Sequence, residues 1–161
     1  MKSSLIKNNL VLLCLCVLFS GCKPSSNEMY LNKTEDDWKA YLSEISGKQE
    51  PSLKNTVLLV LKSSECSPAL NELKSWNALD ETNSEVKVKL VVVERYATTT
   101  KVLLEQEGIN LPMYQDSIAL VLRKELLPAT PIKVFIDDKG KVKRLAAIDS
   151  RTKIEDFLTF N

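Results

Sequence analysis

The sequence predicts a single α/β domain with a mixed sheet, preceded by a short export segment. Two apolar strands are expected at residues 55–61 and 86–94, with a helix between them. A strand at 132–137 is followed by the turn residues Asp138-Lys139-Gly140 and a second strand at 141–146. Strands that are joined by a helix pair in parallel and place helices on the sheet faces, whereas the closing hairpin is antiparallel.

Helices account for most of the remaining chain. Residues 34–46 carry apolar side chains every three or four positions, and Thr34 and Asp37 have the spacing of a capping box. Similar spacing predicts helices over 67–80, 99–107 and 117–127, and a last one from Ile154 onward. Pro68 then falls in the first turn of its helix, where a missing N–H has no cost. Residues 109–114 are expected to be extended.

The first 22 residues have the features of a secretory signal. Lys2 and Lys7 precede an uncharged apolar run, Leu10 to Phe19, which is too short to cross a bilayer. Leu18-Phe19-Ser20-Gly21-Cys22 resembles a bacterial lipobox, which implies cleavage before Cys22 and a lipid on its thiol. The alternatives are a plain signal peptide or a buried helix. We therefore predict a signal over 1–21, a polar tether over 22–33 and a folded domain over 34–161.

These features restrict location, partners and cofactors. A lipid on Cys22 would hold the domain at a membrane of the bacterial envelope, on the periplasmic or the cell-surface side. A net charge of +1 gives no reason to expect nucleic acid as a partner. The chain has no histidine, which removes imidazole catalysis and most zinc sites, and it has no phosphate-binding glycine loop. We expect no metal and no other cofactor.

Cys66 is the residue that raises a question of chemistry. Cys14 and Cys16 would leave with the signal and Cys22 would carry the lipid, so Cys66 alone would remain as a thiol. Oxidising compartments usually pair their cysteines, and an unpaired one is a candidate reactive group. The simpler interpretation is a small buried apolar side chain.

Four stretches, in order along the chain, resemble the thioredoxin-like superfamily. They are Cys66-Ser67-Pro68-Ala69 after the first strand, the insertion INLPMYQDS, Thr130-Pro131 before the strand at 132–137, and the hairpin PIKVFIDDKGKVKRL. The last is similar to membrane-anchored envelope thiol–disulfide oxidoreductases. The resemblance implies a three-layer fold, in which a central mixed sheet has helices on both faces, with an N-terminal helix and an extra βα-type insertion. It also implies that Cys66 is the nucleophile and that Thr130 and Pro131 form a cis-proline loop that binds substrate backbone.

The chain departs from this family at three positions. Ala69 stands in place of the second cysteine, Glu65 in place of a tryptophan, and Val60 where many members bury an acid. A dithiol cycle therefore cannot run within this chain, because a mixed disulfide at Cys66 has no neighbouring thiol to resolve it. A helix N-terminus favours the thiolate, and Glu65 opposes it with partial compensation from Lys62. We expect a modestly lowered pKa for Cys66.

Three functions follow as hypotheses, and whether the chain is an enzyme stays open. In the first, Cys66 exchanges thiol and disulfide with a protein or peptide partner, and an external thiol resolves the adduct. In the second, a non-catalytic module presents the Thr130-Pro131 loop to a protein partner. In the third, which is weaker, Cys66 is the single cysteine of a peroxidase assisted by Ser63 and Arg123. Pro131 has its own simpler interpretation as a rigid loop residue.

Overall fold

The computed structural model describes residues 28–149 and 153–159 of the chain. The predicted signal over 1–21 and Cys22 lie outside these residues, and the predicted domain limits stay predictions. Within the described residues no helix has the length and apolar character needed to cross a bilayer.

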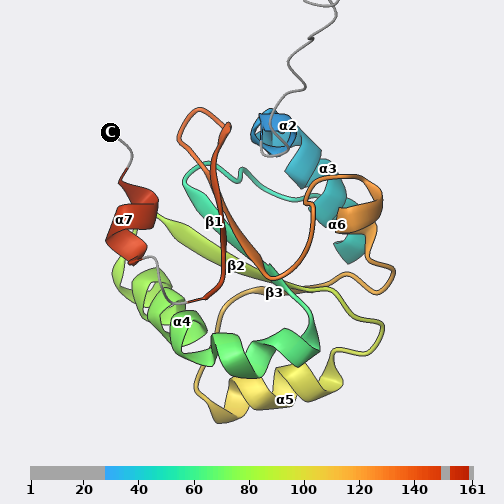
Figure 1. Ribbon diagram of the computed structural model, residues 1–161, viewed down its shortest axis with the longest axis vertical. Helices are drawn as coiled ribbons and strands as arrows, with labels where there is room; N and C mark the ends of the chain where they lie inside the picture. Colours follow the sequence, from blue (N-terminus) through green and yellow to red (C-terminus); the bar gives the residue numbers. More distant parts are fainter. Residues whose placement is uncertain (1–27, 150–152, 160–161) are drawn as a thin grey trace, which may run out of the picture.

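The centre of the molecule is a five-stranded mixed sheet in the order β3-β2-β1-β4-β5 (Figure 1). Its strands are β1 (Thr56–Leu61), β2 (Lys87–Val92), β3 (Met113–Gln115), β4 (Ile132–Ile136) and β5 (Val142–Ala147). The first three run parallel to one another, whereas β4 is antiparallel to β1 and β5 is antiparallel to β4. All six residues of β1 are buried, as expected of a central strand between two helical layers.

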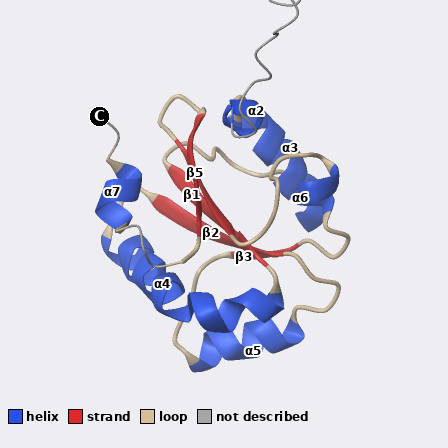
Figure 2. Ribbon diagram, viewed as in Figure 1, coloured by secondary structure: helices blue, strands red, loops and turns tan. Residues whose placement is uncertain are grey.

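Helices cover both faces of this sheet (Figure 2). They are α2 (Glu28–Leu31), α3 (Glu35–Ser46), α4 (Ser63–Thr82), α5 (Thr98–Gln106), α6 (Leu120–Arg123) and α7 (Ile154–Leu158). One core joins alternate strand residues to α4, α5 and α7, and includes Leu59, Cys66 and Trp76. The other joins the opposite strand face to α3 and α6, and includes Trp38 and Val60. The predicted three-layer α/β architecture is confirmed.

Helix α3 forms where the sequence predicts it. The backbone N–H of Thr34 donates to the Asp37 carboxylate at 2.8 Å, which closes the N-terminal side of the predicted capping box. Trp38 is fully buried on the inner face. The helix ends at Gly47, whose φ of 67° is the left-handed conformation that a glycine adopts at low cost.

Two predicted helices differ from the observed ones. Helix α4 begins at Ser63, four residues before the predicted start, because the Glu65 carboxylate accepts the Lys62 N–H at 2.7 Å and caps an earlier turn. The predicted helix over 117–127 shrinks to the four residues of α6. Its N-terminus is fixed by Asp116, which accepts the N–H groups of Leu120 and Val121, and left-handed residues at Ala119 and Glu125 flank it.

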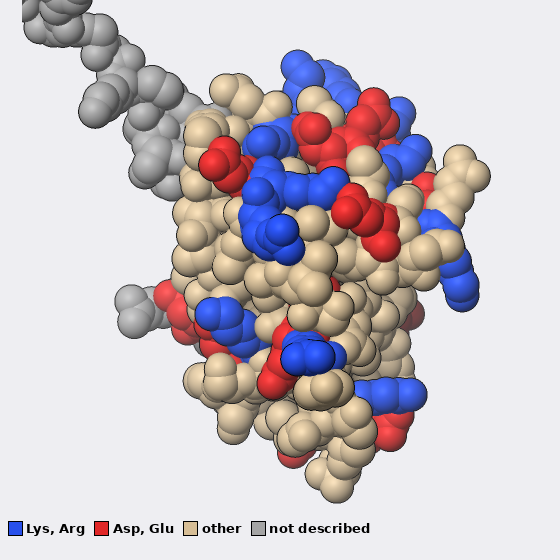
Figure 3. All heavy atoms as spheres, turned by 90° about the vertical axis from the view of Figure 1, so that its right-hand side faces the viewer, with Lys and Arg blue, Asp and Glu red and all other residues tan. Residues whose placement is uncertain are grey.

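The N-terminal helices pack beside the β4–β5 hairpin. The four residues of α2 lie within the segment predicted as a tether. The carbonyl of Lys33 accepts the Val142 N–H at 3.4 Å, and the Glu35 N–H donates to the Gly140 carbonyl at 2.7 Å. Figure 3 shows the side of the molecule that carries α3 and α6, with charges of both signs interspersed near its top.

Candidate functional site

Three loops meet at one end of the sheet. Strands β1 and β2 are parallel, and β4 is antiparallel to β1 with Val60 opposite Ile132. The carboxyl ends of β1 and β2 and the start of β4 therefore lie together. This arrangement brings three loops to the same end of the sheet, formed by residues 62–66, 93–97 and 128–131. Loops at the carboxyl ends of parallel strands are the usual place for a site in an α/β fold. The predicted site residues Cys66, Thr130 and Pro131 all belong to this end.

Cys66 is enclosed in the first turn of α4. Its side chain is 0% exposed and belongs to the core formed with α5 and α7. The sequence predicted a cysteine just ahead of the helix, at an exposed turn. Because α4 begins at Ser63, Cys66 is instead the fourth helical residue and its sulfur faces the sheet.

Glu65 closes this turn from outside. One carboxylate oxygen accepts the Lys62 N–H, and the other accepts the Thr130 hydroxyl at 3.1 Å. Glu65 thus connects the start of α4 to the loop before β4. From the sequence, Glu65 was expected only to oppose the thiolate by its negative charge. Its capping role was not predicted, because Lys62 occupies the N-cap position where a capping box usually has Ser or Thr.

Burial raises the pKa of the Cys66 thiol to about 11, and this is the largest effect on that group. A hydrogen bond with Thr100 lowers the pKa, and the negative charges of Glu65 and Glu94 raise it further. The prediction of a lowered pKa was wrong, because desolvation of the enclosed thiolate outweighs the partial positive charge of the helix N-terminus. Cys66 is a neutral thiol at physiological pH.

A buried hydroxyl pair lies beside the sulfur. Thr100 of α5 is 2% exposed, and its hydroxyl donates to the Ser63 hydroxyl at 2.5 Å. Ser63 is therefore engaged in joining α4 to α5. Arg123, the arginine considered for a peroxidase, lies on α6, which packs on the opposite face of the sheet from Cys66 (Figure 1). The peroxidase hypothesis thus lacks an arginine at the sulfur among the residues it named.

The positions that would support a dithiol cycle are apolar and buried. Ala69 is 3% exposed and packs in the same core as Cys66. Val60 is fully buried on the other face of the sheet. Cys66 is the one free cysteine among the described residues. Neither a resolving thiol nor a buried proton acceptor replaces the missing groups at these two positions.

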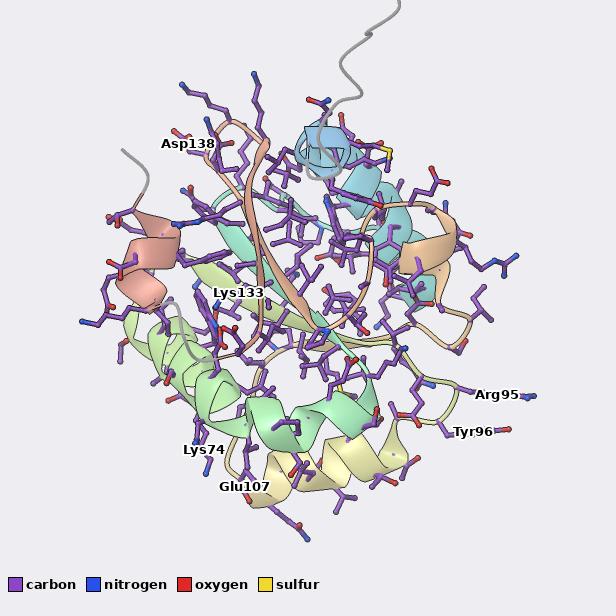
Figure 4. All side chains as sticks on the ribbon, in the orientation of Figure 1. Lys74, Arg95, Tyr96, Glu107, Lys133 and Asp138 are labelled. Carbon is purple, nitrogen blue, oxygen red and sulfur yellow. The ribbon has the colours of Figure 1, made fainter. Side chains whose placement is uncertain are left out.

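The outer surface of this end has polar and aromatic groups. The Thr130–Pro131 peptide bond is cis. In the loop after β2, Tyr96 is 71% exposed and the Arg95 guanidinium lies 5.5 Å from its ring centroid. Figure 4 shows both side chains projecting away from the body of the molecule. No pattern in the sequence predicted this pair, although tyrosine and arginine in a loop after a strand are residue types that often make protein contacts.

The described residues contain no group of three or more His, Cys, Asp or Glu side chains that could hold a metal ion. One oxygen of Glu94, near the thiol, is buried without a hydrogen-bond partner. It acts on Cys66 by its charge, which disfavours the thiolate.

Comparison with known proteins identifies the architecture. No protein-family model matches the chain, and no curated protein sequence matches it. The structure is similar to that of a secreted Mycobacterium tuberculosis disulfide oxidoreductase homologous to E. coli DsbE, with a TM-score of 0.53 and 15% identity over 65% of this chain and 78% of that one. The chain has a thioredoxin-like fold.

Two further solved structures agree with this fold. A thiol-disulfide oxidoreductase from Bacteroides fragilis has a TM-score of 0.50 and 15% identity over 68% of this chain and 85% of its own. A DsbF homologue from Corynebacterium diphtheriae has a TM-score of 0.50 and 16% identity over 65% and 72%. Identities this low show a shared thioredoxin-like architecture, and the chemistry of this chain has to be argued from its own site.

Proposed function

We propose that this chain is a lipid-anchored protein of the bacterial envelope whose thioredoxin-like domain binds a protein partner without thiol chemistry of its own. The observation that carries the proposal is the enclosed sulfur of Cys66, which is 0% exposed and has a pKa raised to about 11. A neutral, enclosed thiol does not attack a disulfide of another protein. The export and the lipid rest on the sequence of residues 1–22.

The binding face consists of Glu65, Arg95, Tyr96, Thr130 and Pro131. It combines an exposed aromatic ring, a stacked guanidinium and a loop held in place by the Thr130–Glu65 hydrogen bond. Tyrosine and arginine are enriched among the residues that dominate protein interfaces. A pre-positioned loop also loses less conformational entropy when a partner binds.

Alkylation of Cys66 by iodoacetamide tests the absence of thiol chemistry. At pH 8 we expect the folded protein to react at least 100-fold more slowly than the protein in urea, because the pKa rises from 9.0 to about 11 and the sulfur is enclosed. A folded protein that reacts as fast as the unfolded one would disprove a non-catalytic role. The folded protein, before any treatment with iodoacetamide, should also fail to reduce insulin disulfides.

Site-specific photo-crosslinking in cells tests the binding face. A photoreactive amino acid at Tyr96 should yield a discrete adduct, whereas the same group at Val102, which is exposed on α5, should not. The Tyr96 adduct should persist in a Cys66→Ala variant. Loss of the adduct in that variant would show that the thiol takes part in partner recognition.

Thiol–disulfide exchange is the second candidate, and one observation favours it. Pro68 lies inside α4 and has no N–H, so the carbonyl of Ser64 receives no helical hydrogen bond from it, which weakens the first turn. An opened turn would expose Cys66. Its thiolate would then attack a partner's disulfide, form a mixed disulfide and release the partner's other thiolate, and an external thiol would release Cys66 again.

The Ala69→Cys variant separates the two candidates. It restores the C-x-x-C spacing beneath the same helix turn. If the turn opens, the variant should gain insulin-reducing activity; if the site is closed, it should stay inactive. Ala69→Ser is the matched control, because it makes a similar change in size without a thiol.

The anchor has its own test. Cys22→Ser should abolish incorporation of labelled palmitate and move the protein from the membrane to the soluble fraction of the envelope. Cys14→Ser should leave both properties unchanged, because Cys14 lies in the predicted signal. Unchanged labelling of Cys22→Ser would contradict lipidation at this residue.

A further inference from the structure

Strand β3 forms one edge of the sheet, and its outer hydrogen-bonding groups have no partner among the described residues. Leu90 donates its N–H to the Pro112 carbonyl, and Asp116 donates its N–H to the Val92 carbonyl. Pro112 and Asp116 therefore face β2. Because backbone groups alternate along a strand, the N–H and C=O groups of Met113 and Gln115 point away from β2. The missing N–H of Pro112 falls on the inner side and leaves this outer row complete.

A hollow lies on each side of this edge. The first, which we call the edge groove, has a volume of about 390 Å³ and lies between residues 46–51 and β3. Its floor includes Glu50, a loop residue that is only 5% exposed because it binds the Lys89 ammonium at 2.5 Å and the Tyr114 hydroxyl at 2.9 Å. This ion pair holds the wall of the groove in place, and Lys48, an exposed residue of the lining, gives the groove a positive charge.

The second hollow, which we call the α5 hollow, has a volume of about 210 Å³. Its apolar lining is Leu104, Ile109, Leu111 and Met113, and Lys101, Glu105 and Asn110 form its rim. Met113 packs with the α5-side core and Tyr114 with the α3-side core. The two hollows therefore lie on opposite faces of the sheet, and Met113 lines both of them.

We infer that an extended segment of another polypeptide adds to the outer edge of β3. The backbone of an extended segment can satisfy the outer N–H and C=O groups of both Met113 and Gln115, because its own groups repeat at the spacing of a strand. Successive side chains of an added strand point to opposite faces, which matches one hollow on each face. The segment carries an apolar residue toward the α5 hollow, between polar residues that are directed into the edge groove and can be acidic, because Lys48 lines that groove. This site is separate from the binding face at the strand ends.

A peptide selection tests this inference. A display library of random dodecapeptides is selected on the purified full-length protein in detergent, and the enriched sequences are synthesised. We expect alternating polar and apolar residues in these peptides. In the complex, the exchange of the Met113 and Gln115 amide protons should slow at least tenfold, and that of the exposed Tyr96 amide should not change.

Peptide N-methylation supplies a control that leaves the protein intact. Methylation of every second backbone nitrogen removes donors from one edge of the peptide only. One alternate set should weaken binding at least tenfold, and the other should change it less than twofold. On the protein, Met113→Pro removes an outer donor while it keeps the bonds to β2, and it should weaken binding at least tenfold.

Four results would overturn the inference. The selection yields no binding peptide, or both methylated sets bind alike. Alternatively, the selected peptides protect amides at Thr130 and not at Met113, which would place them on the binding face. A free protein that sediments as a dimer with Met113 already protected would show that a second copy of the chain occupies the edge.

Discussion

At the residue scale, one side chain decides what the candidate site can do. Glu65 caps α4, contacts Thr130 and adds negative charge beside Cys66. In the family that the chain resembles, a tryptophan stands at this position and the next residue attacks. Here the cap places the helix start at Ser63, closer to the N-terminus than predicted, and Cys66 is a core residue. For the chemistry of this site, the presence of Glu65 is therefore as important as the absence of a second cysteine at Ala69.

The raised pKa of Cys66 predicts a pH dependence of stability. Between pH 9 and 11 the thiol of the unfolded protein has lost its proton and that of the folded protein has not. Ionisation therefore stabilises the unfolded state only, and the free energy of unfolding falls as the pH rises. The stabilisation by this group is complete below pH 9 and is lost as the pH rises through about 11. Across this range the free energy of unfolding should fall by about 2–3 kcal/mol more in the wild type than in Cys66→Ala. Urea denaturation at fixed pH values measures it.

Parallel stability curves for these two proteins would contradict this prediction. Titration of the tyrosines and lysines is common to both, so it cancels in the difference. The comparison therefore isolates the thiol, even though Cys66→Ala also lowers stability at every pH by removing a buried atom.

The sequence predicted the position of this site but not its state. The order of Cys66, Thr130 and Pro131 relative to the strands was sufficient to bring them to one end of the sheet. Whether the sulfur is exposed depends on the helix start, which is decided by one carboxylate bound to one backbone N–H. That contact leaves no periodic pattern in the sequence. Because the helix begins four residues earlier than predicted, Cys66 lies inside it, where its side chain is buried.

At the element scale, the helices and strands with strong periodicity were predicted well. The alternating or continuous apolar runs predicted β1, β2, β4 and β5 to within a few residues, whereas β3 overlaps a segment, 109–114, that was expected only to be extended. Helix α6 is shorter than predicted because its limits depend on the Asp116 side chain and on left-handed residues at both ends, which compete with an amphipathic pattern. The four-residue α2 has too few positions to show a period.

The hairpin turn between β4 and β5 gives a prediction with an internal control. Gly140 has a φ of 74°, and a Cβ there would lie 2.7 Å from a carboxylate oxygen of Glu35. Gly108 has a φ of 70° with no atom within 4 Å of such a Cβ. Both Ala variants incur the cost of a left-handed conformation, about 1 kcal/mol, and Gly140→Ala should lose at least a further 1 kcal/mol.

Thermal and urea unfolding of both glycine variants measure this difference. Because Glu35 also binds the Ser52 hydroxyl and the Leu53 N–H, its side chain cannot move aside without losing those bonds. Equal stability losses in Gly140→Ala and Gly108→Ala would show that the contact with Glu35 relaxes freely.

At the scale of the whole molecule, a buried ion pair joins the sheet to its helical cover. Lys133 of β4 is 0% exposed and binds the Glu72 carboxylate of α4 at 2.5 Å, and the same carboxylate accepts the Trp76 indole N–H. The Lys133 ammonium also lies 5.2 Å from the Phe157 ring of α7. Figure 4 shows Lys133 inside the molecule, unlike Lys74 at its periphery. A lysine in a strand gave no sequence signal of such a position.

Removal of one charge of this pair should be costly. We expect Lys133→Met to lower the free energy of unfolding by about 3 kcal/mol, because Glu72 stays buried beside an apolar side chain. Adding Glu72→Gln should recover at least 1 kcal/mol, since the amide keeps an oxygen for Trp76 and has no charge. Urea unfolding of the single and double variants measures both effects. An unchanged free energy of unfolding in Lys133→Met would contradict a stabilising role of this ion pair.

The exposed pair Lys74–Glu107 is the control, and Lys74→Met should lower the free energy of unfolding by less than 1 kcal/mol.

The packing of α2 against the β4–β5 hairpin has a consequence for orientation. The hairpin lies at the end of the sheet opposite Thr130 and Tyr96, and α2 lies beside it (Figure 1). Residues 23–27 span at most about 20 Å, so a lipid on Cys22 would hold the hairpin end close to the bilayer surface. Met29 and Leu31, both partly exposed, lie at that end. The domain would then face the membrane with the hairpin and turn α5 and the Tyr96 loop away from it (Figures 1 and 4). Partners that diffuse in the aqueous space would reach that side more readily than neighbours embedded in the same leaflet.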